Sequence, residues 1–94
     1  MNKYESVIII DSTLTKEKFD GVVNKITTFL REKGKLTKVD DIGIKKLAYE
    51  IDKMKEGHYL ILEFETERET IAELERIYRI TDEIKKFLTM KRED

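Results

Sequence analysis

Acid–base or nucleophilic chemistry would need a histidine, a thiol or a matched carboxylate pair, and this chain offers few such groups. It has no cysteine, and His58 is its only histidine. His58 has two interpretations, a general base or a structural residue on a strand, but no second histidine is present to complete a triad or a metal site. The many acidic residues, including Glu63, Glu65, Glu67 and Glu69, could form a carboxylate pair, yet their regular mixing with basic residues is more typical of solvated faces.

Glycine spacing and composition also argue against nucleotide chemistry. The four glycines are isolated from one another, so no glycine-rich phosphate loop is present. The sequence therefore predicts a protein that is not an enzyme, with no cofactor, no metal and no small-molecule substrate. Its first residues lack the apolar core of a signal peptide and no apolar run could span a membrane, so a cytoplasmic protein is expected.

Basic side chains occur in pairs that could contact phosphate groups. These pairs are Lys45-Lys46, Lys85-Lys86 and Lys91-Arg92, and Lys3 adds a further cation. Nineteen Lys and Arg against twenty Asp and Glu give a formal net charge of −1, so no overall positive field attracts a polyanion. Any RNA site must be local, and the same pairs also fit ordinary solvated strands.

The elements that position these groups follow from hydrophobic periodicity. Strands are expected at 4–10, 36–51, 58–65 and 84–90, the second with a bulge within 40–43, and a polar turn at 52–57. One helix follows the first strand and is expected to end at Gly34, and another follows the third strand after a capping box formed by Thr66 and Glu69.

The predicted order β-α-β-β-α-β is that of an α+β ferredoxin-like sandwich, a four-stranded sheet with two helices on one face. The first and third strands should be central and the other two should lie at the edges. Residues 1–94 are expected to form one domain, because the chain has no proline, no linker and no repeat. The opposite face of the sheet is left without a helix, so partners could dock there.

An apolar patch is predicted on this uncovered face. Leu60 and Leu62 have one parity on the third strand, and Tyr59 and Ile61 have the other. Tyr59 and Ile61 would form an apolar patch with Leu47 and the residues of the same parity on the second strand if all of these side chains point away from the helices. Such a patch would bind a protein partner or a second copy of the chain. Alternatively, the second strand is inverted and its apolar side chains lie in the core. Stacking on RNA bases, as in RRM domains, is a further possibility, but their aromatic-rich glycine motif is absent.

One stretch resembles a known family. Residues 43–51, Gly-Ile-Lys-Lys-Leu-Ala-Tyr-Glu-Ile, are similar to the signature of the bacterial small ribosomal subunit protein six family. Tyr4-Glu5, Gly57-His58-Tyr59, and Arg79-Ile80 before Asp82 extend the resemblance over almost the whole chain. Many members have proline where this chain has Glu50. The resemblance implies a ferredoxin-like structural protein of the small ribosomal subunit that binds the central domain of its RNA together with small ribosomal subunit protein eighteen.

By position in the resembling family, a set of residues is expected to contact RNA: Lys3, Tyr4, Lys45, Lys46, Lys86, Lys91 and Arg92. A second set on the uncovered face is expected to contact the protein partner: Leu47, Tyr49, Tyr59 and Ile61. The alternative hypothesis is a homo-oligomeric ferredoxin-like module that binds a small molecule between two open sheet faces, since the same apolar patch would serve both.

Overall fold

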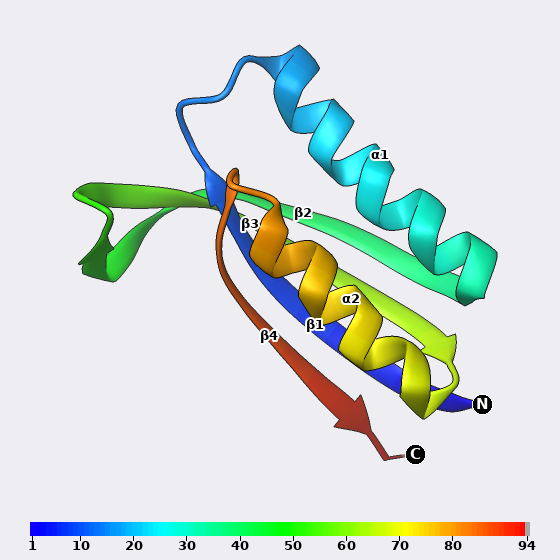
Figure 1. The fold of residues 1–94 in the computed structure, drawn as a ribbon. Coiled ribbons are helices and arrows are strands. Elements are labelled where there is room, and N and C mark those ends of the chain that lie inside the picture. The colour runs from blue at the N-terminus through cyan, green and yellow to red at the C-terminus, as the bar shows by residue number, and fades with distance from the viewer. Residues whose placement is uncertain (94) are drawn as a thin grey trace.

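Six elements follow one another along the chain in the predicted order (Figure 1). The computed structural model describes residues 1–93. The elements are β1 (Asn2–Asp11), α1 (Lys16–Lys33), β2 (Gly34–Ile51), β3 (Met54–Thr66), α2 (Arg68–Ile80) and β4 (Ile84–Arg92).

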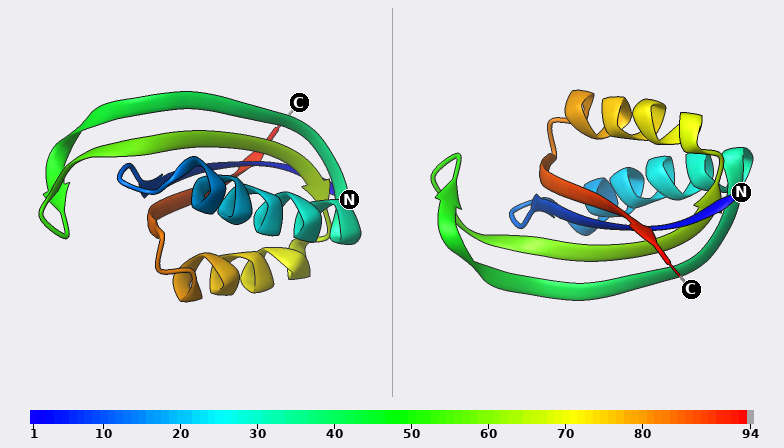
Figure 2. Two further views of the ribbon diagram at one scale, coloured as in Figure 1. Left: turned by 90° about the horizontal axis from the view of Figure 1, so that it is seen from above. Right: turned by 90° about the horizontal axis from the view of Figure 1, so that it is seen from below.

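The four strands form one antiparallel sheet in the order β2-β3-β1-β4. Strands β1 and β3 are therefore central, as predicted, and both helices pack on the same face of the sheet (Figure 2). This is the predicted ferredoxin-like sandwich. The β2–β3 hairpin extends beyond the rest of the sheet, because β3 pairs with β1 only from Gly57 onward.

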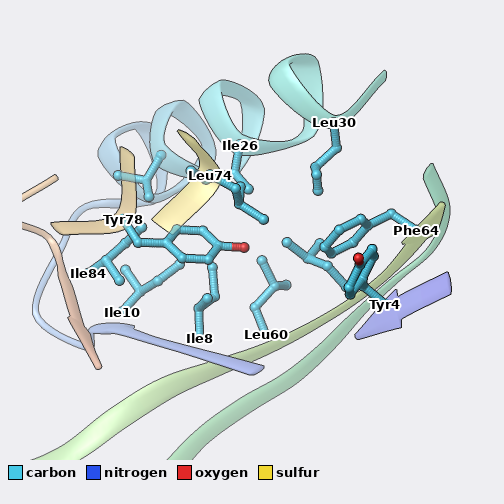
Figure 3. Close-up of a cluster of buried hydrophobic side chains, with 12 residues drawn as sticks. Tyr4, Ile8, Ile10, Ile26, Leu30, Leu60, Phe64, Leu74, Tyr78 and Ile84 are labelled. Atoms are coloured by element: carbon cyan, nitrogen blue, oxygen red, sulfur yellow. The ribbon is translucent and has the colours of Figure 1, made fainter. Parts of the chain in front are cut away.

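The core lies between the sheet and the two helices (Figure 3). Ile8 and Leu60 from the two central strands meet Ile26 of α1 and Leu74 of α2, and all four side chains are fully buried. Each such burial contributes about 1.5–3 kcal/mol relative to an exposed side chain. Because side chains alternate along a strand, this core uses one parity of β1 and β3 and leaves the other parity on the open face.

The connection from β1 to α1 is fixed by local hydrogen bonds of short polar side chains. The Asp11 carboxylate accepts from the backbone N–H of Thr13 at 2.9 Å and from its hydroxyl at 2.7 Å. These two bonds hold the pKa of Asp11 below its usual value. Thr15 is the N-cap, since its hydroxyl accepts from the N–H of Lys18 at 3.2 Å.

Helix α1 ends where Gly34 begins β2, as predicted, but the reason is steric. Gly34 has φ −177°, an extended conformation that any residue adopts. A Cβ at this position would lie 2.0 Å from the carbonyl oxygen of Glu65. The chain therefore needs glycine here because β3 passes directly beside it.

The prediction of a turn over 52–57 is wrong, because pairing continues almost to the end of the hairpin. The turn consists of Asp52 and Lys53 alone, with φ of 50° and 67°, and β3 already begins at Met54. Two successive positive φ values give a tight turn whose twist matches the flanking strands. This stretch resembled a loop because four of its six residues are charged and exposed at the end of the hairpin.

The predicted capping box of Thr66 and Glu69 is also wrong. Thr66 still belongs to β3, is fully buried, and donates its hydroxyl to the carbonyl of Lys33 at 2.9 Å. The N-cap of α2 is Glu67, which makes no side-chain capping bond. Thr66 therefore ties the start of α2 to the end of α1.

The predicted bulge in β2 is confirmed at Ile42. The pairing of β2 with β3 shifts between Asp41 and Gly43, and Gly43 has φ 95°. The Asp41 carboxylate accepts from the N–H of Gly43 at 3.0 Å and supports this conformation.

Candidate functional site

The face of the sheet opposite the helices carries an apolar strip in its middle. Strand pairing places Ile9 beside Tyr59, and Val7 between Ile61 and Leu88. Leu88 is 57% exposed and Met90 is 41% exposed. We call the following residues the open-face strip: Val7, Ile9, Tyr59, Ile61, Leu88 and Met90.

The β2–β3 hairpin extends this strip at one end. Leu47 and Tyr49 line a hollow together with Ile9 and Tyr59, and Lys86 is also among its lining residues. Tyr49 is 82% exposed, so its ring is available for contact. The structure thus brings Leu47, Tyr49 and Tyr59 together on one surface.

Ile61 follows Tyr59 as the next open-face residue on β3, beside Val7. The four residues that the sequence assigned to a protein contact therefore share one side of the sheet. Sequence reasoning missed the contributions of β1 and β4, namely Val7, Ile9, Leu88 and Met90. Their parity, opposite to that of the buried Ile8, was the available signal.

An ion-pair network lies beside the strip. Nη1 of Arg92, on β4, lies 2.6 Å from Oε1 of Glu63, on β3, and 3.1 Å from Oε1 of Glu5, on β1. Nζ of Lys38, on β2, lies 3.7 Å from Oε2 of Glu63 and 3.9 Å from the carboxylate of Asp40. The network therefore spans all four strands.

The basic residues that the sequence assigned to RNA are distributed over several places. Lys3 and Arg92 are paired neighbours at one end of the open face, whereas Lys86 lies beside Ile9 near the middle. Lys45 and Lys46 are exposed on the hairpin. The predicted cations thus form no single cluster.

Two members of that set are placed away from the open face. Lys91 pairs with Tyr4, so its exposed side chain leaves β4 on the helix side. Tyr4 is only 6% exposed, and its ring stacks on Phe64 with 5.9 Å between centroids. Tyr4 is therefore a core residue, and only a small part of it is left to contact RNA.

His58 has a structural role, which was one of its two interpretations. Its ring stacks on Phe19 of α1 with 4.0 Å between centroids, and Nε2 lies 2.6 Å from Oδ1 of Asp41 on β2. His58 thereby joins β3 to two neighbouring elements. Within residues 1–93 no group of three or more His, Cys, Asp or Glu side chains is arranged to hold a metal ion.

Comparison with known proteins agrees with this arrangement. The sequence matches the family described as Ribosomal protein S6 over residues 3–91. The chain belongs to the ribosomal protein S6 family. It is 39% identical over 94 residues to small ribosomal subunit protein bS6 of a Nitratiruptor species, covering 99% of this chain and 73% of the relative.

Two further S6 proteins match at full or nearly full length. The bS6 protein of Caldanaerobacter subterraneus subsp. tengcongensis is 34% identical over 95 residues and is covered completely. The crystal structure of 30S ribosomal protein S6 from Thermotoga maritima superimposes with a TM-score of 0.91 at 35% identity, covering 97% of this chain and 87% of that chain.

Family membership makes this chain a structural protein of the small ribosomal subunit and not an enzyme, and places it in the cytoplasm. It confirms the resemblance that rested on residues 43–51. Among the described residues, no helix is long and apolar enough to cross a membrane.

Proposed function

We propose that this S6 protein binds the central domain of small-subunit ribosomal RNA together with small ribosomal subunit protein eighteen. The observation that carries the proposal is the uncovered apolar face in a protein of this family. Apolar patches of this kind on small proteins mark interaction sites.

The open-face strip and the hairpin residues Leu47 and Tyr49 are the proposed protein contact. Tyr59 lies beside Ile9 and lines the same hollow as Leu47 and Tyr49, and its ring is rigid and amphipathic. Aromatic residues in such central positions often dominate binding energy. The carboxylates of Glu5 and Glu63 at the border of the strip favour a basic partner.

The proposed RNA contacts are exposed cations of the strands and the hairpin: Lys3, Lys45, Lys46, Lys86, Lys91 and Arg92. Because the net charge is −1 and these cations are dispersed, we expect the lone chain to bind RNA weakly. Binding of the partner would build a composite surface, so RNA binding should be cooperative.

The test compares Tyr59→Ala with Lys91→Ala. We expect Tyr59→Ala to weaken binding to protein eighteen by at least tenfold, since a central aromatic contact is lost. Lys91→Ala should leave that affinity unchanged and reduce the slope of log K against log salt for RNA by about one. Calorimetry for the partner and filter binding at several salt concentrations for the RNA supply both readouts.

Two outcomes would count against the proposal. Unchanged partner binding by Tyr59→Ala would remove the open face as the protein contact. A stable homodimer that binds neither the RNA nor protein eighteen would instead support the oligomeric module, and sedimentation of the purified chain with and without both components detects it.

A further inference from the structure

One nitrogen of the Arg92 guanidinium is held by two carboxylates in this structure, although Arg92 lies on the proposed RNA-binding end of β4. Its Nη1 is shared between Glu63 at 2.6 Å and Glu5 at 3.1 Å. A guanidinium held by two carboxylates is poorly placed to bind a phosphate, because the phosphate would meet the same two negative charges.

The carboxylates that hold Arg92 are also suited to a cation from another protein. Glu5 and Glu63 pair with Arg92, and Glu63 and Asp40 pair with Lys38. Arg92 itself demonstrates that a guanidinium fits between Glu5 and Glu63. The charge and the geometry are therefore suited to the arginine or lysine of a docking protein.

The carboxylates lie next to the apolar strip. Glu5 and Val7 are successive open-face residues of β1, and Glu63 and Ile61 are successive open-face residues of β3. A partner segment that covers Val7 and Ile61 would bring its next side chain over the two carboxylates. Covering them would also reduce the solvent screening that makes exposed ion pairs weak.

We propose, on the basis of the function proposed above, that a basic protein docks on the open face and that one of the partner's cations replaces Arg92 at Glu5 and Glu63. The exchange keeps both carboxylates paired and releases the Arg92 side chain at the end of β4. The released guanidinium then binds an RNA phosphate. Partner binding and RNA binding are thereby coupled through a single residue, and by linkage the coupling acts in both directions.

The exchange predicts that Arg92 matters more for RNA after the partner has bound. In the lone chain, where Nη1 of Arg92 is held by Glu5 and Glu63, Arg92→Gln should weaken RNA binding by a smaller factor than it does with the partner bound. With saturating protein eighteen, the same variant should bind RNA at least about threefold more weakly, and its salt slope should fall by about one, as expected for one lost phosphate contact.

A second variant releases Arg92 without the partner. In the double variant Glu5→Gln, Glu63→Gln we expect the lone chain to bind RNA at least about threefold more tightly and protein eighteen more weakly. The factor by which the partner raises RNA affinity should fall toward one. Glu65→Gln is a control for the loss of a carboxylate from the same face of β3, because Arg92 keeps both of its carboxylates. In this variant the factor by which the partner raises RNA affinity should equal that of the unaltered chain.

The decisive comparison adds Arg92→Gln to the double glutamine variant. The gain in RNA affinity of the lone chain should disappear, whereas a general charge effect would persist. The inference is overturned if Arg92→Gln weakens RNA binding equally with and without the partner, or if the double glutamine variant keeps the coupling factor of the unaltered chain. If the unaltered chain binds neither RNA nor protein eighteen, the proposed function itself fails, which is a separate result.

Discussion

Tyr78 places a polar atom, its hydroxyl, in the apolar core. Its ring fills the centre of the core and is 1% exposed (Figure 3). Among residues 1–93 its hydroxyl has no hydrogen-bond partner. The hydroxyl of Ser6 lies close enough to act on the Tyr78 phenol, but its short hydrogen bond, at 2.7 Å, is with the hydroxyl of Thr89. Burial is the main cause that raises the pKa of the Tyr78 phenol well above its ordinary value.

We expect Tyr78→Phe to leave the free energy of unfolding unchanged or to raise it by up to about 1 kcal/mol, because an unpaired buried hydroxyl is removed while the ring stays. Urea denaturation at pH 7 provides the measurement. Tyr78→Ala is the contrasting variant and should cost about 3–5 kcal/mol through the cavity it leaves. A clear loss of stability in Tyr78→Phe would mean that the hydroxyl is hydrogen-bonded in solution.

The same residue gives a prediction at alkaline pH. The pKa of Tyr78 is higher in the folded chain than its unfolded value of 10.0. Folding therefore favours the protonated phenol, and this contribution is present below pH 10 and is lost as the pH rises above it. We expect the stability difference between the unaltered chain and Tyr78→Phe to shift further in favour of the variant above pH 10, measured by urea denaturation at successive pH values. An equal difference at pH 8 and pH 11 would contradict the assignment.

At the scale of elements, two glycines in the first half of the chain have opposite roles. Gly21 lies in the interior of α1, and a Cβ there would meet nothing within 4 Å. Gly34 joins α1 to β2, where a Cβ would collide with the backbone of Glu65. At Gly21 the effect of an added methyl group therefore depends on backbone entropy, and at Gly34 it depends on contact with the neighbouring strand.

Gly21→Ala should therefore stabilise the protein by about 0.5–1 kcal/mol, because alanine restricts the unfolded chain and favours the helix. Gly34→Ala should destabilise it by about 1–3 kcal/mol, because β3 must move to admit the methyl group. The two variants differ from the unaltered chain by the same methyl group, so each is the other's control. Urea midpoints that shift in the same direction would refute the steric role of Gly34.

At the scale of the whole molecule, exposed apolar residues lie on both sides of the sandwich but in different surroundings. Leu88 belongs to the open-face strip and is 57% exposed, whereas Ile80 ends α2 on the helix side and is 60% exposed. Their nearly equal exposure makes them a matched pair for asking which face docks a partner.

We expect Leu88→Glu to weaken binding to protein eighteen by at least tenfold, since a carboxylate would be buried in the apolar strip beside Val7. Ile80→Glu should leave that affinity unchanged. Calorimetric titration measures both, and circular dichroism verifies the fold. Equal weakening by the two substitutions would show that net charge, and not the open face, governs the interaction.

The sequence by itself determined the order of elements, the sheet topology and the family. Strand parity and helical spacing are local properties, and the stretch from Gly43 to Ile51 carries the family resemblance in consecutive residues. The same parity of β3 correctly separated Leu60 and Leu62, in the core, from Tyr59 and Ile61, on the open face.

Only the tertiary structure decided which groups are available. Tyr4 became a core residue because Phe64 and the helices cover it, and Thr66 became a buried tie to α1 instead of a helix cap. Arg92 was joined to Glu5 and Glu63, which lie 87 and 29 residues away along the chain. Such contacts depend on how β1, β3 and β4 are aligned side by side, and no local pattern specifies that alignment.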